Sequence, residues 1–326
     1  MASNDSEAIH VSVKDLKPGD SVLQFFELRS KDMRKTRGGD SYLDLTAGDA
    51  TGTIAAKMWP EAIRKWGDDF KPGDFVKIEG RVETFRERNQ LVVEKIRVVS
   101  ASEVPDTTSL VRATGYDPDV LFLELTEKAR ALKPAEMAEL VSEILARNAD
   151  AFKTYPAARM VHHACVGGLI EHVATMTRKV EAIAAVEPAI DRDLAVAGAL
   201  LHDIGKLREL NPTQRGRTSE GRLIGNLILG VEMIMEMALE KELADRKWLR
   251  DLEHIVLAHH GELEFGSPVK PFTREAMLVH FVDNLDSRLK ILDEALESPE
   301  VDGFSAYNKW LSGRAYAGSS ALQEEE

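Results

Sequence analysis

The chain has 326 residues, of which 44% are hydrophobic and 30% charged, a balance typical of a globular protein with a sizeable core. Its length predicts two domains, or three at most. Its net charge of −13 argues against a surface that binds polyanions along the whole molecule.

Three further features predict where the protein works. No stretch of about 18 apolar residues is present, so we expect no membrane span. The start, MASNDSEAIH, lacks the basic and apolar segments of a signal peptide. Cys165 is the only cysteine, which excludes an internal disulfide. These features predict a cytoplasmic protein.

Residues 11–104 are expected to form a small β-domain. Five segments rich in β-branched and aromatic residues are separated by turn signals such as Pro18-Gly19-Asp20. One helical piece, Pro60–Trp66, precedes the fourth segment. This order matches a Greek-key barrel of the OB type, with a generic β-sandwich as the alternative. The five segments are SVLQFFELRS, SYLDLTAG, GTIAAKMW, DFVKIEGRVETF and QLVVEKIRVVS.

The same region combines aromatic and basic residues, as proteins that bind single-stranded nucleic acid do. Residues 11–100 hold 17 Lys or Arg and 15 Asp or Glu, a balance of +2, against −15 for the rest of the chain. The basic hairpin KDMRKTRGGDSY is the best binding candidate, although such a loop is about as often simply solvated. The nucleic-acid-binding candidates are Arg34, Lys35, Arg37, Tyr42, Trp59, Arg86 and Arg88.

Residues 105–118 lack sustained periodicity and contain Ser, Thr, Pro, Asp and Gly, which predicts a linker. From residue 119 to residue 315 apolar residues recur at spacings of three and four, which predicts helices. The polar residues 316–326 are expected to be a disordered tail. The predicted fold class is therefore multidomain α+β, with an N-terminal OB-type β-barrel followed by an all-helical domain.

The helical region concentrates the histidines, since eight of nine lie between His162 and His280. His172 is expected on a helix that opens near Pro156 and runs to about Ala185. The string LAVAGALLHDIGKL predicts an apolar helix that ends at His202 and Asp203. A later helix carries Asp283, and Asp286 lies three residues on along the same face. Each signal is weak alone, and the order of the motifs on successive helices gives them weight.

Asp203 ends a run of buried character, where a carboxylate without a partner is costly. One metal ion would satisfy Asp203 together with His202, His172 and Asp283. Imidazole plus carboxylate suits Mn, Fe, Co, Ni or Zn better than Ca. Such an ion lowers the pKa of bound water and holds a phosphoryl oxygen, and Lys206, one turn beyond His202, is a candidate phosphate clamp.

Three motifs of the helical region resemble those of a known family. GGLIEH, LLHDIGK and FVDNLD are similar to motifs of the HD-domain metal phosphohydrolase superfamily, which is all-helical. The fuller strings HHACVGGLIEH, EGRLIGN, LAHHGELEFGSPVKPFTREA and VDNLDSRL resemble one branch, the YhaM-type 3′-5′ exoribonucleases. That branch carries an OB-type domain ahead of its HD domain, in agreement with the division reached from pattern. The resemblance implies that the core metal ligands are His172, His202, Asp203 and Asp283.

The resemblance also implies roles around the ligands. His259 and His260 match positions that serve a second metal in binuclear relatives, or the substrate side. Asn226 stands where the family pattern has a histidine, so one tight ion, a weaker second site or altered activity are all open, as is a variation without effect. Asp203 and Lys206 are the catalytic candidates. The substrate-binding candidates are His163, Arg222, Asn226 and Lys270.

The leading hypothesis is a metal-dependent 3′-5′ exoribonuclease that hydrolyses phosphodiesters by a metal-activated water, with one or two ions and manganese favoured. Single-stranded RNA is the expected partner, with single-stranded DNA as a further candidate, and oligomerisation is left open. One alternative is an HD-type phosphodiesterase of small nucleotides. Another is a nucleic-acid-binding protein whose metal centre is impaired, which the departure at Asn226 suggests.

Overall fold

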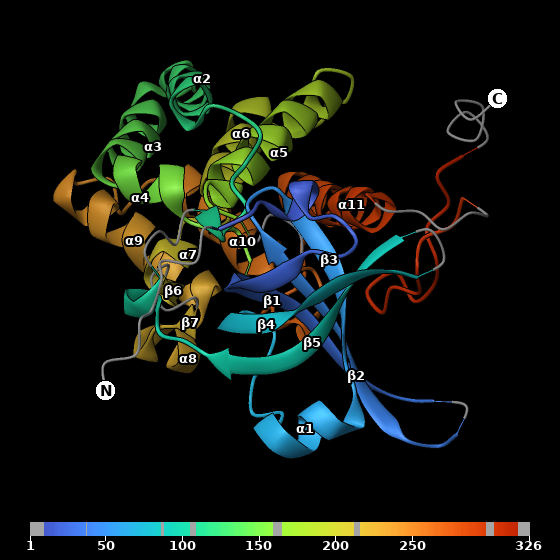
Figure 1. The fold of residues 1–326 in the computed structure, drawn as a ribbon. Coiled ribbons are helices and arrows are strands. Elements are labelled where there is room, and N and C mark those ends of the chain that lie inside the picture. Colours follow the sequence, from blue (N-terminus) through green and yellow to red (C-terminus); the bar gives the residue numbers. More distant parts are fainter. Residues whose placement is uncertain are drawn as a thin grey trace. The chain divides into compact units, whose positions relative to one another are not determined.

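The computed structural model describes residues 10–36, 38–85, 88–104, 109–158, 165–211, 216–297 and 303–318. The chain divides into two compact units, Met1–Ala113 and Thr114–Glu326. Figure 1 shows strands in the first unit and helices in the second. Each unit is described by itself.

The first unit is a closed five-stranded barrel with the strand order β1-β2-β3-β5-β4. All neighbouring strands are antiparallel except β3 and β5, which are parallel. The helix α1 (Pro60–Trp66) stands between β3 and β4. The prediction of an OB-type barrel is therefore confirmed. The strands are β1 (Ser21–Lys35), β2 (Ser41–Asp49), β3 (Gly52–Met58), β4 (Phe75–Phe85) and β5 (Arg88–Val98).

The barrel is held by an apolar core to which every strand contributes. Phe26, Leu45 and Ile78 are almost fully buried inside it. Closure pairs both edges of the sheet, which leaves no free edge for association with another chain. Leu110 and Val111, within the predicted linker 105–118, are buried beside the barrel strands with Phe75 and Val99.

The second unit is helical, as predicted, with only one two-stranded ribbon among its described residues, β6 (Leu210–Asn211) with β7 (Gly216–Arg217). No helix in the described ranges is both long enough and apolar enough to span a bilayer. The helices are α2 (Pro118–Arg130), α3 (Ala135–Arg147), α4 (Ala149–Thr154), α5 (Gly168–Ala184), α6 (Arg192–Leu201), α7 (Lys206–Glu209), α8 (Ser219–Leu223), α9 (Asn226–Glu240), α10 (Lys247–Ala258) and α11 (Arg274–Leu296).

Helix α6 forms the centre of this unit, because all residues from Leu194 to Leu201 are buried. The Asp191 side chain accepts a hydrogen bond from the Leu194 backbone N–H and caps the start of the helix. Helices α5 and α11 both pack against α6. The packing therefore brings residues far apart in the sequence to the C-terminal end of α6.

The predicted start of the helix that carries His172 is wrong. The helix begins at Gly168 rather than near Pro156. Tyr155, which precedes this proline, is extended, as the steric effect of a following proline favours. Gly167 then has φ of 73°, and a Cβ there would lie 2.7 Å from a side-chain atom of Thr114. This left-handed residue turns the chain into α5.

The predicted tail 316–326 is described only to residue 318, and Tyr316 there pairs with Phe304 in an isolated antiparallel bridge. The disorder predicted for the remainder concerns residues outside the described ranges.

Candidate metal centre

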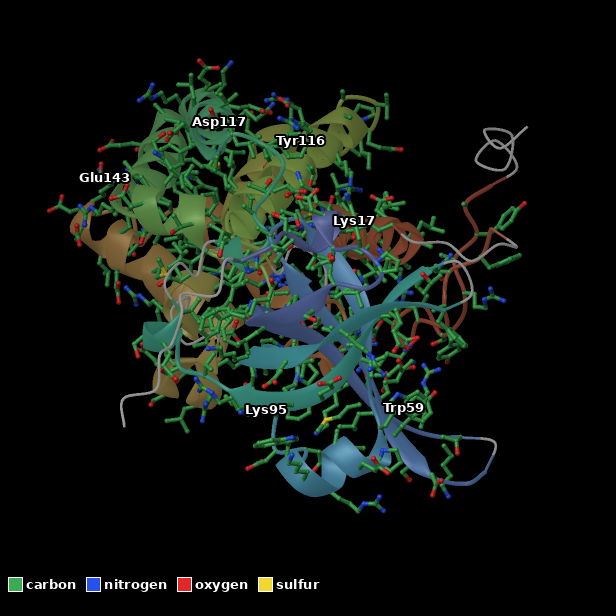
Figure 2. All side chains as sticks on the ribbon, in the orientation of Figure 1. Lys17, Trp59, Lys95, Tyr116, Asp117 and Glu143 are labelled. Atoms are coloured by element: carbon green, nitrogen blue, oxygen red, sulfur yellow. The ribbon has the colours of Figure 1, made fainter. Side chains whose placement is uncertain are left out.

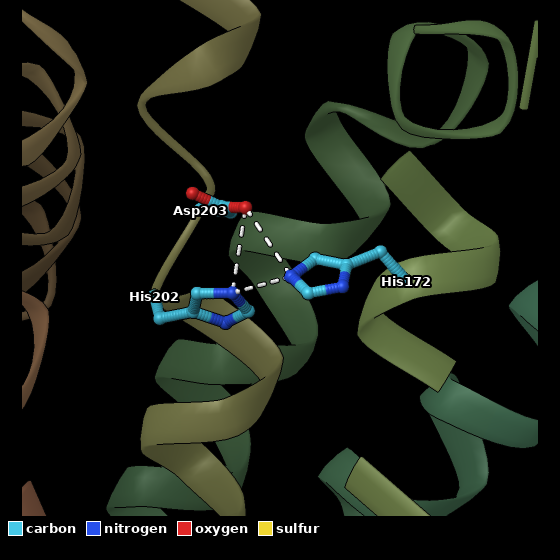
Figure 3. Close-up of side chains that lie close together, drawn as sticks. All are labelled: His172, His202 and Asp203. Carbon is cyan, nitrogen blue, oxygen red and sulfur yellow. Dashed lines mark hydrogen bonds and ion pairs between the residues drawn. The ribbon is translucent and has the colours of Figure 1, made fainter. Parts of the chain in front are cut away.

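Three side chains from α5 and from the end of α6 converge in the second unit. The Nε2 atoms of His172 and His202 are 3.2 Å apart, and Asp203 Oδ2 lies 3.6 Å and 3.4 Å from them. Figure 3 shows the three side chains pointing toward one another, His172 from α5 and the consecutive residues His202 and Asp203 from the end of α6. All three residues are buried. A polar group of this centre that lost its partner would therefore be poorly solvated.

Helix α11 adds a second carboxylate. Asp283 Oδ1 lies 3.3 Å from the Nε2 atom of His172. The predicted helix around Asp283 is confirmed. Of the four residues expected to share one ion, His172, His202 and Asp203 form a cluster. Asp283 contacts this cluster through His172. The Thr273 side chain accepts a hydrogen bond from the Ala276 backbone N–H and so caps α11.

The facing atoms are mostly hydrogen-bond acceptors. His202 Nδ1 lies 2.9 Å from the carbonyl oxygen of Ala199, which can only accept, so Nδ1 carries the proton and Nε2 presents a lone pair. His172 Nδ1 is likewise held by Asp286, at 2.7 Å. Lone pairs of two imidazoles and two carboxylates then face one another. Such a cluster requires positive charge in its middle.

The pKa values of His172 and Asp203 also indicate a need for positive charge in the cluster. Burial by itself lowers the pKa of His172, but hydrogen bonds with Asp283 and Asp286 outweigh it and raise that pKa to about 9. Burial raises the pKa of Asp203, but the adjacent Lys206 cation outweighs it and holds that pKa well below the usual range. Asp203 and Asp283 are therefore ionised. The His172 imidazole between them binds a proton when no other cation is present.

A divalent transition metal fits this donor set. Ligand atoms bonded at about 2 Å to one ion lie about 3 Å from each other, close to the separations of 3.2 to 3.6 Å seen here. Imidazole nitrogens and carboxylate oxygens are also the ligands such ions prefer. The residues that would hold it are His172, His202, Asp203 and Asp283.

Contacts between α5 and α11 hold His172 in its orientation. Asp286, buried one turn beyond Asp283, accepts from His172 Nδ1 and forms an ion pair with Lys179 of α5. Glu171, next to His172, pairs with Lys290 of α11 at 2.7 Å. These two ion pairs join α5 to α11 next to the ligands. The sequence had shown Asp286 on the correct face, but gave no signal for Lys179, because a lysine on a helix is usually solvated.

His259 and His260 follow the end of α10 beside the cluster. His259 Nε2 is 3.7 Å from Asp203 Oδ1, and the two neighbouring histidine rings are 4.5 Å apart between centroids. Gly261 has φ of 83°, and a Cβ there would overlap the His280 ring, whose Nδ1 lies 2.8 Å from the His259 carbonyl. This glycine lets His280 pack beneath the turn and position His259.

His260 differs from His172 in its charge. Burial and the adjacent His259 lower the pKa of His260 to about 4. Its Nδ1 lies 3.0 Å from the carbonyl oxygen of Phe265 and must carry the proton of the neutral ring. The other ring nitrogen of His260 therefore presents a lone pair.

Lys206 and Asn226 contact different oxygens of Asp203. The Lys206 Nζ atom is 2.6 Å from Asp203 Oδ2, and Asn226 Nδ2 is 3.5 Å from Oδ1. A Cβ on Gly205 would lie 2.0 Å from the Asn226 carbonyl oxygen, so this glycine allows the start of α9 to approach the turn that follows His202 and Asp203. Asn226 thus lies beside Asp203 Oδ1, the oxygen that His259 also faces.

Other predicted site residues lie apart from this cluster. Lys270 pairs with Glu262 at 2.9 Å on the surface of the loop after α10. Arg222 is exposed at the end of α8, and no described contact joins it to the ligands. His163 falls outside the described residues, as do Arg37 and Arg86 of the barrel.

On the barrel, part of the predicted nucleic-acid-binding set comes together. Arg34 pairs with Tyr42 across β1 and β2, and the rings of Tyr42 and Trp59 are 5.2 Å apart. Trp59, labelled in Figure 2, is 42% exposed, and Lys57 lies over the Tyr42 ring. Lys35 is exposed at the end of β1, whereas Arg88 belongs to the separate β4–β5 hairpin.

Comparison with known proteins identifies both units. Residues 169–288 match the HD domain family, and residues 27–99 match a family described as an OB-fold nucleic acid binding domain. The first range contains all four candidate ligands. The HD domain implies a divalent metal, in agreement with the donor set. The second range covers most of the barrel, which supports single-stranded nucleic acid as its ligand.

Relatives match nearly the whole chain. A protein of Halalkalibacterium halodurans named 3′-5′ exoribonuclease YhaM is 33% identical over 302 residues, which cover 91% of this chain and 93% of that protein. Its namesake in Bacillus subtilis is 33% identical over 280 residues, covering 86% and 88%. A match to the second OB-fold domain of replication protein A from Methanococcus maripaludis covers 27% of this chain and 93% of that domain, with 21% identity. Its TM-score of 0.23 is too low to support any inference about this chain.

Proposed function

Because the chain belongs to the YhaM family of 3′-5′ exoribonucleases, we propose that it removes nucleotides one at a time from the 3′ end of single-stranded RNA. The observation that carries this proposal is the convergence of two imidazoles and two carboxylates in the HD unit, joined in one chain to an OB-fold domain. Single-stranded DNA is a further candidate substrate.

The ion and the side chains supply different parts of the hydrolysis reaction. A divalent ion held at this cluster supplies a Lewis acid and lowers the pKa of a bound water. His172, His202, Asp203 and Asp283 hold it, and we assign manganese as the working ion. Lys206, the cation beside Asp203, is placed to bind a non-bridging oxygen of the scissile phosphate. Neutral His260 can accept a hydrogen bond from the substrate or complete a second ion site.

The number of ions depends on Asn226. An amide is a weaker ligand for a transition metal than an imidazole. Its Nδ2 atom also faces Asp203 Oδ1, the oxygen that lies 3.7 Å from His259 Nε2. We therefore propose one tightly held ion, with any second ion bound more weakly. The four-residue set stays complete, which supports an active enzyme over one with an impaired centre.

The barrel supplies substrate affinity in this proposal. Tyr42 and Trp59 offer stacking surfaces for bases, and Arg34, Lys35 and Lys57 offer cations near them. The cytoplasm is the compartment we propose, because an exoribonuclease requires RNA and buried Cys165 cannot form an internal disulfide.

The direct test incubates the full chain with a 5′-labelled oligoribonucleotide and Mn²⁺. We expect a ladder of products shortened from the 3′ end, which a chelator abolishes. His202→Ala should be inactive, whereas His254→Ala, a histidine of α10 outside the cluster, should retain activity. Unchanged substrate with wild type, or equal shortening by wild type and His202→Ala, would overturn the proposal.

A further inference from the structure

Helix α11 has two apolar faces. One is buried in the helical unit and includes Leu278, Val279 and Val282. The other is a row at a spacing of four, namely Met277, Phe281, Leu285 and Leu289, each 41 to 61% exposed. Phe272, just before the helix, is 81% exposed. A helix that packs on one side only normally has polar residues on the other. We call these five residues the α11 row.

We propose that the α11 row binds the α11 row of a second copy of this chain, in antiparallel orientation about a two-fold axis. Rows at a spacing of four form the ridges that pack into an identical set of grooves in the commonest class of helix packing. A row of this kind is therefore suited to a partner like itself.

The area agrees with a dimer interface. If a fully exposed Leu, Met or Phe side chain offers about 200 Å², the α11 row exposes roughly 500 Å². Such a patch is at the size that marks an interaction site. A standard interface buries about 800 Å² on each partner and is about 65% apolar in homodimers, which requires roughly the same apolar area.

Shape selects the antiparallel orientation. A cavity of about 670 Å³ lies beside the N-terminal half of the row, lined by Ile190, Phe272, Met277 and Phe281 among others. The C-terminal half carries Leu285 and Leu289, which do not line it. Antiparallel pairing about the middle of the row sets Leu285 opposite Phe281, and Leu289 opposite Met277. The leucines of each copy then face the cavity of the other, whereas parallel pairing sets cavity against cavity.

Charge selects the same orientation. Exposed Arg274 stands at the N-terminal end of α11, and exposed Asp293 stands near its C-terminal end. Antiparallel pairing brings unlike charges together, and parallel pairing brings like charges together. At 3.6 residues per turn, Met277, Phe281 and Leu285 lie on the side of α11 away from Asp283, so the second copy would not cover this metal ligand.

Molar mass measured by sedimentation velocity on the full chain tests this directly. We expect wild type to have twice the 36.2 kDa mass of one chain. Phe281→Lys should weaken association by about 30-fold or more, as for the central residue of an interface. Leu239→Lys, at a leucine of α9 that is 64% exposed, is the matched control and should associate like wild type. Circular dichroism and metal content should be the same for all three proteins.

Cross-linking supplies a second measurement that does not depend on a disruptive variant. Leu285→Cys treated with a short bismaleimide should give a covalent dimer, while Leu239→Cys and wild type, whose only cysteine is buried Cys165, should not. A wild-type chain that is monomeric at all concentrations would overturn the proposal. An assembly that Phe281→Lys leaves intact, or equal cross-linking at positions 285 and 239, would do the same.

Discussion

The barrel and the helical unit bring their functional side chains together in different ways. In the barrel, Arg34 and Tyr42 face each other across one hairpin, and Trp59 follows the next strand, so sheet register places neighbours that are close in sequence. In the helical unit, His172, Asp203 and Asp283 lie on elements separated by tens of residues. Their meeting depends on how α5, α6 and α11 pack.

This difference predicts different sensitivities. A residue on the barrel surface contributes additively, because neighbouring aromatics and cations can act without it. The four proposed ligands are expected to act as a unit, because removal of one leaves the remaining buried charges without compensation. We therefore expect large losses of catalysis from changes in the helical unit, and graded losses of affinity from changes on the barrel.

The largest effect is expected for Asp203→Asn. This carboxylate contacts both ligand imidazoles and Lys206, and stabilisation by a metal ion is worth several kcal/mol, with each 1.36 kcal/mol a factor of ten. We expect kcat for RNA hydrolysis to fall about 10³-fold or more, while the Kd for RNA measured in EDTA stays unchanged. Retained turnover would contradict the role of Asp203.

A smaller effect is expected for Asp286→Ala. This residue holds His172 in the orientation that points Nε2 at the cluster, and partners of this kind are typically worth 10–100-fold in metal affinity. Metal titration by calorimetry should show this loss. Asp293→Ala, an exposed aspartate on the same helix, is the control. Equal metal affinity of the two variants would mean that packing alone orients His172.

On the barrel, Trp59→Ala should weaken binding of single-stranded RNA. Stacking on one aromatic side chain is worth about 1–3 kcal/mol, roughly a 5- to 150-fold rise in Kd. Because Trp59 does not belong to the metal centre, kcat at saturating RNA should not change. Trp310→Ala, at an exposed tryptophan of the second unit, should leave Kd as it is. If Trp59→Ala lowered kcat and left Kd constant, the barrel would not be the part of the chain that supplies affinity for RNA.

The smallest effect is expected for Arg34→Gln. One lost phosphate contact on a single strand lowers the slope of log K against log salt by about 0.7. Arg34 already pairs with Asp44 at 2.9 Å, which limits its contribution. Binding titrations over a range of salt concentrations measure this slope. An unchanged slope would indicate that Arg34 remains with Asp44 when RNA binds.

The barrel and the helix positions could be predicted because local patterns determine them. Strand alternation and turn residues predicted all five barrel strands, and the apolar run up to His202 predicted α6. The start of α5 was predicted too early, since left-handed Gly167 determines it and no periodicity signals such a turn. The order of the motifs on successive helices grouped the four ligands, the family resemblance agreed with that grouping, and the structure supplies the distances.

Contacts that depend on packing could not be predicted. The ion pair between Lys179 and Asp286 joins helices more than 100 residues apart. The close approach of Gly205 to the start of α9, and of Gly261 to His280, depends on backbone positions that sequence spacing does not reveal. The α11 row has the spacing of an ordinary buried helix face, and only its exposure in the structure distinguishes it.

The central claim is that His172, His202, Asp203 and Asp283 hold one divalent ion. Anomalous scattering from crystals of the full chain grown with Mn²⁺ measures this directly. We expect a strong manganese peak about 2 Å from the two Nε2 atoms and from one oxygen of each carboxylate. A peak elsewhere in the molecule, or its absence at this cluster with Lys206 still bound to Asp203, would contradict the claim.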